Sequence, residues 1–166
     1  QSLAAIGQGF GALPEAAEWP GLNEYDPAAL IHAIHPGPLA RPDTPEAYRA
    51  HFRLLRQALA AWMAGQTQPA GMPSWADFSA GVAAALDHVR ASHLGDVLLV
   101  SSGGPIATAV QQVLGAPAEA MVELNMRIRN SACTEFEFTP RRHALLCFNH
   151  VPHLHHPERR HWETWA

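Results

Sequence analysis

A short polar turn between an apolar run and a helical segment is the part of the sequence best suited to chemistry. Residues 101–104, read SSGG, follow the run Val97–Val100, and apolar residues at helical spacing begin at Pro105. Glycines let the backbone turn sharply, and proline suits a first helical position because it lacks only an N–H that has no partner there. The turn therefore offers N–H groups, two hydroxyls and the positive end of a helix dipole to an anion such as phosphate. A tight turn without a ligand fits the same pattern.

The elements around this turn predict an α/β fold. Four consecutive apolar residues bounded by Gly and Pro indicate a strand buried on both faces, so we expect Val97–Ser101 to be an interior strand of a mostly parallel sheet. The following helix would return over that sheet. The expected architecture is a three-layer α/β/α sandwich.

Helices and a hairpin account for most of the remaining chain. Start signals and apolar periodicity predict helices over Pro27–His35, from Pro45 to beyond Trp62, from Ser74 to Val89, and from Pro117 to Asn125. The second of these carries an apolar stripe of Tyr48, Phe52, Leu55, Leu59 and Trp62, which we expect to be core. Alternation of Phe136 and Phe138 with glutamates predicts a strand, and the TPRR turn predicts that His143–Phe148 pairs back on it.

The same segments resemble the C-terminal half of the histidine phosphatase (phosphoglycerate mutase-like) superfamily. The similarity lies in VLLVSSGGPI, LNMRIRNSACTEFEF and FNHVPHL, and it is most specific from Val97 to Leu154. In most of the superfamily this strand ends in Ser-His-Gly-Gly, and the His is one of two that embrace the transferred phosphoryl group. Ser102 stands at that position here, which resembles a branch in which the Ser-Gly-Gly version recurs.

The resemblance implies roles for particular residues. Glu24, in GLNEYD, falls where the superfamily keeps an acid that protonates the leaving group, although a solvated loop carboxylate beside Asp26 is the alternative. The residues expected to bind phosphate are Ser101, Ser102, Gly103 and Gly104. The resemblance also implies that the first strand, with the nucleophilic His of an Arg-His-Gly motif, is missing upstream of Gln1. Without that strand we expect the chain to be inactive and prone to pair its open edge with another copy.

Composition excludes several classes of protein. The 166 residues, 48% of them hydrophobic, are enough for one compact domain, which we expect to span residues 1–166. The formal net charge of −4 provides no basic surface for nucleic acid. We find no membrane-spanning stretch and no signal-peptide pattern, and we expect a cytoplasmic protein that does not bind membranes.

The histidine-rich tail does not form a standard metal motif. His150, His153, His155, His156 and His161 lie close in sequence, but their spacing matches no zinc module, so we expect neither a metal site nor a cofactor. We expect the two cysteines, Cys133 and Cys147, to be reduced and to lie in the hairpin.

Two functional hypotheses follow. In the first, the intact protein is a metal-independent phosphatase acting on a phosphorylated small molecule or another phosphoester, through a phosphohistidine. In the second, the domain binds phosphate or a partner without catalysis, because the Ser102 hydroxyl lacks the charge of an imidazolium. A hydrolase with Ser102 as the nucleophile is disfavoured, since no GxSxG sequence is present. A homodimer is compatible with either hypothesis.

Overall fold

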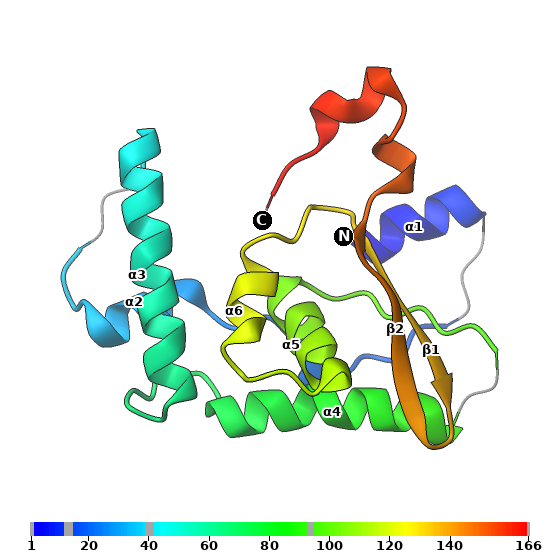
Figure 1. Cartoon of the computed structure of the whole chain (residues 1–166), viewed down its shortest axis with the longest axis horizontal. Coiled ribbons are helices and arrows are strands. Elements are labelled where there is room, and N and C mark those ends of the chain that lie inside the picture. Colours follow the sequence, from blue (N-terminus) through cyan, green and yellow to red (C-terminus); the bar gives the residue numbers. More distant parts are fainter. Residues whose placement is uncertain (1, 12–14, 39–41, 93–94, 166) are drawn as a thin grey trace.

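The computed structural model describes residues 2–11, 15–38, 42–92 and 95–165, in which most of the helices lie to one side of a β-hairpin (Figure 1). The helices are α1 (Ser2–Phe10), α2 (Pro27–Ile34), α3 (Pro45–Met63), α4 (Trp75–Ser92), α5 (Gly103–Leu114) and α6 (Ala120–Asn125). The strands are β1 (Cys133–Thr139) and β2 (Arg142–His150), and the short 3₁₀ helices are η1 (Pro20–Leu22), η2 (Pro152–Leu154) and η3 (Pro157–Trp162). No helix within these ranges is long and apolar enough to cross a membrane.

Local sequence signals set the starts of the two long helices, as predicted. The Thr44 hydroxyl accepts a hydrogen bond from the Ala47 N–H at 3.1 Å, which caps α3 directly before its first proline. At α4, the Ser74 hydroxyl accepts from the Asp77 N–H at 3.1 Å and donates to the Asp77 carboxylate at 2.6 Å. These side chains satisfy backbone groups that have no partner inside the helix.

The apolar run before α5 is not a buried strand, and that prediction was wrong. Residues 96–101 have no regular secondary structure, and the exposed fractions of Leu98, Leu99 and Val100 are 60%, 45% and 37%. Their backbone forms no backbone–backbone hydrogen bond with any other residue that the structure describes. A strand is stabilised by the ladder on a neighbouring strand, and no described segment provides one here.

The sheet that the structure does contain is a two-stranded antiparallel hairpin. Phe136 lies opposite Leu145 and Phe138 opposite His143, with a register irregularity on either side of Glu135. The expected three-layer sandwich with a parallel sheet is therefore not what the described residues form. The predicted hairpin is confirmed.

The main core lies where α2, α3, α4 and α6 meet. Leu55, Leu59 and Trp62 of α3 are buried there, as the periodicity predicted. Tyr48 and Phe52 belong to the same stripe but remain 49% and 39% exposed, because the first half of α3 extends beyond the helices that pack against it (Figure 1). The stripe was therefore predicted correctly only for its second half.

His143 makes the hairpin sensitive to pH. Its ring contacts those of Phe136 and Phe138, and its Nε2 atom is buried with no hydrogen-bond partner among the residues that the structure describes. Burial lowers the pKa of His143, Arg90 lowers it further, and Asp87 opposes both. The neutral imidazole is therefore the form that the fold prefers.

We expect His143 to lower the stability of the chain as the pH falls. Because the folded pKa of His143 lies below its unfolded value near 6.5, this contribution is complete above that pH and declines as the pH falls towards the folded pKa. The substitution His143→Phe should reduce the loss, as thermal unfolding between pH 8 and pH 5 can measure. The exposed His161 supplies the control substitution, His161→Phe. Equal pH dependence in the wild type and in His143→Phe would contradict the assignment.

Candidate functional site

The site begins where α5 meets the loop that precedes α2. The Gly104 N–H donates a hydrogen bond to Glu24 Oε2 at 2.9 Å, and the Tyr25 N–H donates to Glu24 Oε1 at 3.1 Å. Glu24 thus lies beside Gly104, from which it is 80 positions away in the chain. The carboxylate occupies the positive end of the α5 dipole, where negative charge is stabilised.

Close packing requires both glycines of the turn. A Cβ atom on Gly104 would lie 2.1 Å from Glu24 Oε1 and 2.7 Å from the Tyr25 ring, and one on Gly103 would lie 2.5 Å from Asn125 Oδ1. Real Cβ atoms do not approach other atoms so closely. The glycines therefore allow Glu24, Tyr25 and Asn125 to touch the backbone at the start of α5.

Tyr25 and Asn125 connect the turn to the buried core. The Tyr25 ring is buried beside Trp62 and Phe78, with centroid distances of 6.1 Å and 6.2 Å. Its hydroxyl accepts a hydrogen bond from Asn125 Nδ2 at the end of α6. Burial and the nearby charge of Glu24 raise the pKa of the Tyr25 phenol, so that it stays protonated. Glu24 is thereby attached to a residue that is fixed in the core.

The two serines of the turn differ in what they offer a ligand. Ser101 Oγ donates to the Leu22 carbonyl at 2.8 Å, so its proton is used inside the fold. Ser102 is the residue before α5, and its hydroxyl caps no backbone N–H of that helix. It lies close enough to Glu24 to favour the charged carboxylate. Ser101 is therefore bound to a backbone carbonyl, whereas the Ser102 hydroxyl lies at the Glu24 carboxylate, where a ligand at the turn would meet it.

Burial of the carboxylate raises the pKa of Glu24 above its usual range. Hydrogen bonds from the Gly104 N–H, the Ser102 hydroxyl and the Tyr25 N–H lower the pKa without outweighing the burial. Residue 24 as a whole is exposed, so the part withdrawn from solvent is its acidic end. A carboxyl group with a raised pKa holds its proton closer to neutral pH, which suits a general acid.

No positively charged side chain among the described residues forms an ion pair with Glu24. None of the ion pairs between described residues involves this carboxylate. Arg129, the arginine with the most buried ion pair, bonds to the Asn149 carbonyl and to Glu163 instead. The turn thus supplies an acid, N–H donors and a hydroxyl, while any nucleophile and any charge for binding a phosphoryl group must come from elsewhere.

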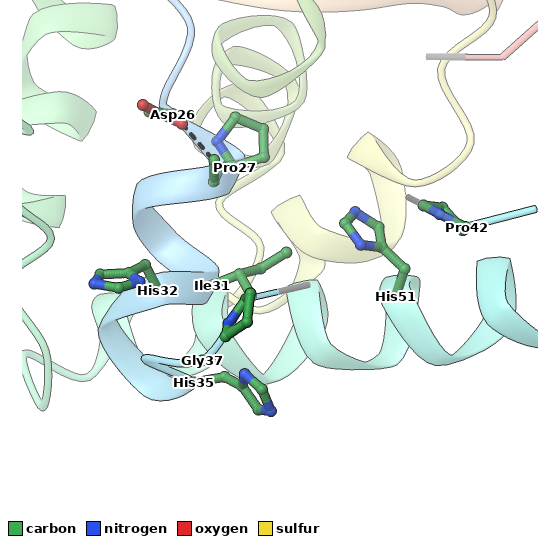
Figure 2. Close-up of a pocket in the computed structure, with 10 residues that line it drawn as sticks. Asp26, Pro27, Ile31, His32, His35, Gly37, Pro42 and His51 are labelled. Carbon is green, nitrogen blue, oxygen red and sulfur yellow. Dashed lines mark hydrogen bonds between the residues drawn. The ribbon is translucent and has the colours of Figure 1, made fainter. Parts of the chain in front are cut away.

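A cavity of about 600 Å³ lies between α2 and α3. Three histidines line it, but Figure 2 shows the imidazoles of His32, His35 and His51 pointing in different directions. The carboxylate of Asp26 accepts hydrogen bonds from the Ala28 and Ala29 N–H groups at the start of α2. The cavity therefore brings no set of ligating groups together.

Within the described ranges, no three His, Cys, Asp or Glu side chains are grouped so that they could hold a metal ion. In the tail, the rings of His150 and His155 lie 5.0 Å apart, and Ser131 Oγ lies 2.9 Å from His153 Nε2. Both cysteines are free thiols. The His153 contact ties the tail to the loop before β1.

Sequence reasoning missed two residues of the site, Tyr25 and Asn125. Tyr25 directly follows Glu24, and an aromatic residue beside a candidate acid is a usable signal for an anchor. Asn125 ends a short helix and meets the site only through packing between α5 and α6, which no local pattern indicates.

The chain matches the model of a known protein family. Residues 31–151 match the family model described as "Histidine phosphatase superfamily (branch 1)", which covers well over half of the 166 residues. The turn at residues 101–104 lies inside the match, and Glu24 lies before it. Neither the curated proteins nor the solved structures give a match.

Proposed function

Because the chain belongs to the histidine phosphatase superfamily, we propose that it is the greater part of a phosphatase domain that hydrolyses phosphomonoesters through a phosphohistidine. The observation that carries the proposal is the Glu24 carboxylate 2.9 Å from the Gly104 N–H, at the start of α5. It joins a candidate proton donor to a set of donors suited to a phosphoryl oxygen.

The proposed reaction divides its roles among few groups. A histidine on a segment outside the 166 residues attacks phosphorus, and the Gly104 N–H and the Ser102 hydroxyl hold the phosphoryl oxygens. Glu24 gives its proton to the leaving oxygen, and water then releases phosphate from the histidine. The substrate is a phosphorylated small molecule or another phosphoester, and the reaction uses no cofactor.

A second candidate function is phosphate binding without catalysis. It is favoured by Ser102 at the position of the superfamily's second histidine, and by the absence of a positive side chain on Glu24 within the described residues. A hydroxyl binds phosphate more weakly than an imidazolium, by about half for a single contact. Both candidates require an anion at the same turn, and only the first requires turnover.

Anion binding at the turn is expected to strengthen as the pH falls. The ionised Glu24 carboxylate already accepts the Gly104 N–H, so an anion gains that donor more readily once Glu24 is protonated. Sulfate is a suitable probe because it does not itself titrate between pH 8 and pH 5. Its affinity, read from amide shifts of residues 101–104, should rise roughly tenfold over that range, equivalent to about 1.4 kcal/mol.

The variant Glu24→Gln tests the same point without a change of pH. It should bind sulfate at pH 8 more tightly than the wild type does at the same pH, with a much weaker pH dependence. Glu119→Gln, on an exposed residue at the start of α6, is the matched control and should behave like the wild type. A sulfate response confined to the histidine-rich tail would reject the site.

A further inference from the structure

The short helix η1, which leads to Glu24, lies against α4 with no side chain between the two backbones. A Cβ atom on Gly21 of η1 would lie 2.6 Å from the carbonyl oxygen of Gly81, in the middle of α4. One on Gly81 would lie 3.0 Å from the Gly21 Cα atom. Carbon atoms that are not bonded to each other usually stay about 3.5–4.0 Å apart. The two elements can therefore approach this closely only because both residues lack a Cβ atom.

Space, and not backbone conformation, accounts for both glycines. Neither Gly21 nor Gly81 has a positive φ angle, so neither occupies the left-handed region that favours glycine. Glycine in the interior of a helix is also less stable than alanine, which makes Gly81 unfavourable for α4 on its own. What Gly81 provides is the close contact with η1.

Two more contacts fix η1 on α4, and one joins it to the turn. The Trp19 ring, directly before η1, lies 4.9 Å from the His88 ring of α4. The Leu22 side chain packs against the small buried cluster between α4 and α5. The Leu22 carbonyl accepts the Ser101 hydroxyl of the turn at 2.8 Å. η1 is therefore held by α4 on one side and by the turn on the other.

Glu24 follows η1 after a single residue, Asn23. The Asn23 N–H donates a hydrogen bond to the Pro20 carbonyl at 3.1 Å, so η1 and Asn23 form one hydrogen-bonded unit. On the other side of Glu24, Tyr25 is buried in the core. Because Tyr25 is held there, the position of η1 determines the direction from which the Glu24 carboxylate approaches the Gly104 N–H.

We propose that Gly21 and Gly81 are positioning residues of the candidate site, whose close contact sets the reach of the Glu24 carboxylate to the Gly104 N–H. A hydrogen bond depends steeply on distance and angle, and this one measures 2.9 Å. An atom inserted between η1 and α4 pushes the two elements apart, and Glu24 moves with η1. That Glu24 acts as an acid rests on the proposed function, whereas the contact between the glycines does not.

The test follows the Gly104 amide proton of the 166-residue chain by NMR as the pH is lowered from 8 to 4. Because this proton is bonded to the Glu24 carboxylate, its chemical shift changes as Glu24 is protonated. Gly81→Ala should reduce that pH-dependent change to roughly half or less, since a weakened hydrogen bond transmits less of the titration. Gly21→Ala, whose Cβ atom meets the closer contact, should reduce it further.

A matched control separates positioning from the stability of α4. Ala80→Gly changes an exposed residue one position before Gly81, and it lowers the helix propensity of α4 without adding an atom at the contact. It should leave the Gly104 titration unchanged. Circular dichroism shows whether each variant is folded. If Gly21→Ala does not fold, Gly81→Ala decides the result, because its alanine favours the helix.

A folded Gly81→Ala chain with the wild-type Gly104 titration would overturn the proposal. So would an equal loss in Ala80→Gly, which would trace the effect to the stability of α4. Neither result depends on a phosphoryl ligand. A reduced titration in Gly81→Ala, in a chain that binds no sulfate at residues 101–104, would support the positioning role and count against the phosphatase proposal.

Discussion

A chain extended at Gln1 by the first strand of the proposed phosphatase, with its nucleophilic histidine, is expected to hydrolyse an aryl phosphate roughly a thousandfold or more faster than the 166-residue chain. The reason is chemical: the turn holds an acid and N–H donors, and none of its residues, Glu24, Tyr25 and residues 101–104, is a histidine. Removing the group that attacks the substrate removes most of the rate of a covalent mechanism. The measurement compares both chains at equal concentration under identical conditions.

The extended chain should also unfold more cooperatively and resist association. Each buried backbone group that gains a partner contributes on the order of 1 kcal/mol, against about 5–15 kcal/mol for a whole domain. A 166-residue chain that melts as a monomer and hydrolyses the phosphate as fast as the longer chain would contradict the phosphatase proposal. An extended chain that binds sulfate at residues 101–104 without turnover would favour the non-catalytic alternative.

Gly104→Ala is expected to lower the free energy of unfolding by about 1–3 kcal/mol and to expel Glu24 from the turn. The added Cβ would lie 2.1 Å from Glu24 Oε1 and 2.7 Å from the Tyr25 ring. The Glu24 side chain can move away, whereas the Tyr25 ring packs against buried aromatic rings and cannot. Chemical denaturation measures the loss, and the NMR titration of Glu24 should shift towards that of a solvated carboxyl group.

Two companion variants make this result specific. Gly9→Ala, in α1, has nothing within 4 Å of its new Cβ and should be neutral or slightly stabilising. Combining Gly104→Ala with Glu24→Ala removes one of the two clashes, so the double variant should recover part of the lost stability. Full additivity of the two substitutions would show that Glu24 does not lie against Gly104.

Local signals predicted the parts of the fold that depend on neighbouring residues in sequence. Thr44 and Ser74 cap their helices as expected, and alternation around Phe136 predicted the hairpin. Val97–Ser101 was predicted wrongly because a strand needs a partner, and an apolar run carries no information about whether that partner is present. The apolar stripe of α3 shows the same limit: Leu59 has packing partners and is buried, whereas Tyr48 lacks them and is exposed.

The candidate site was also only partly predictable from the sequence. Residues 101–104 were identifiable from the glycines and the helix start that follows, and the structure brings Glu24 beside them. The hydrogen bonds from Ser101 to the Leu22 carbonyl and from Asn125 to Tyr25 each join segments that are far apart in the sequence. Packing between elements decides such contacts, so single-sequence patterns do not reveal them.

The aromatic rings that pack beside the turn provide an intrinsic fluorescent probe. The Trp62 ring lies 5.3 Å from Trp75 and 6.1 Å from Tyr25, and Tyr25 is covalently joined to Glu24. Trp162 and Trp165 are about 60% exposed and therefore emit at longer wavelengths than the buried Trp62. Changes at the short-wavelength side of the emission spectrum will therefore report on the neighbourhood of Glu24, so that occupancy of the turn can be followed in solution without an attached dye.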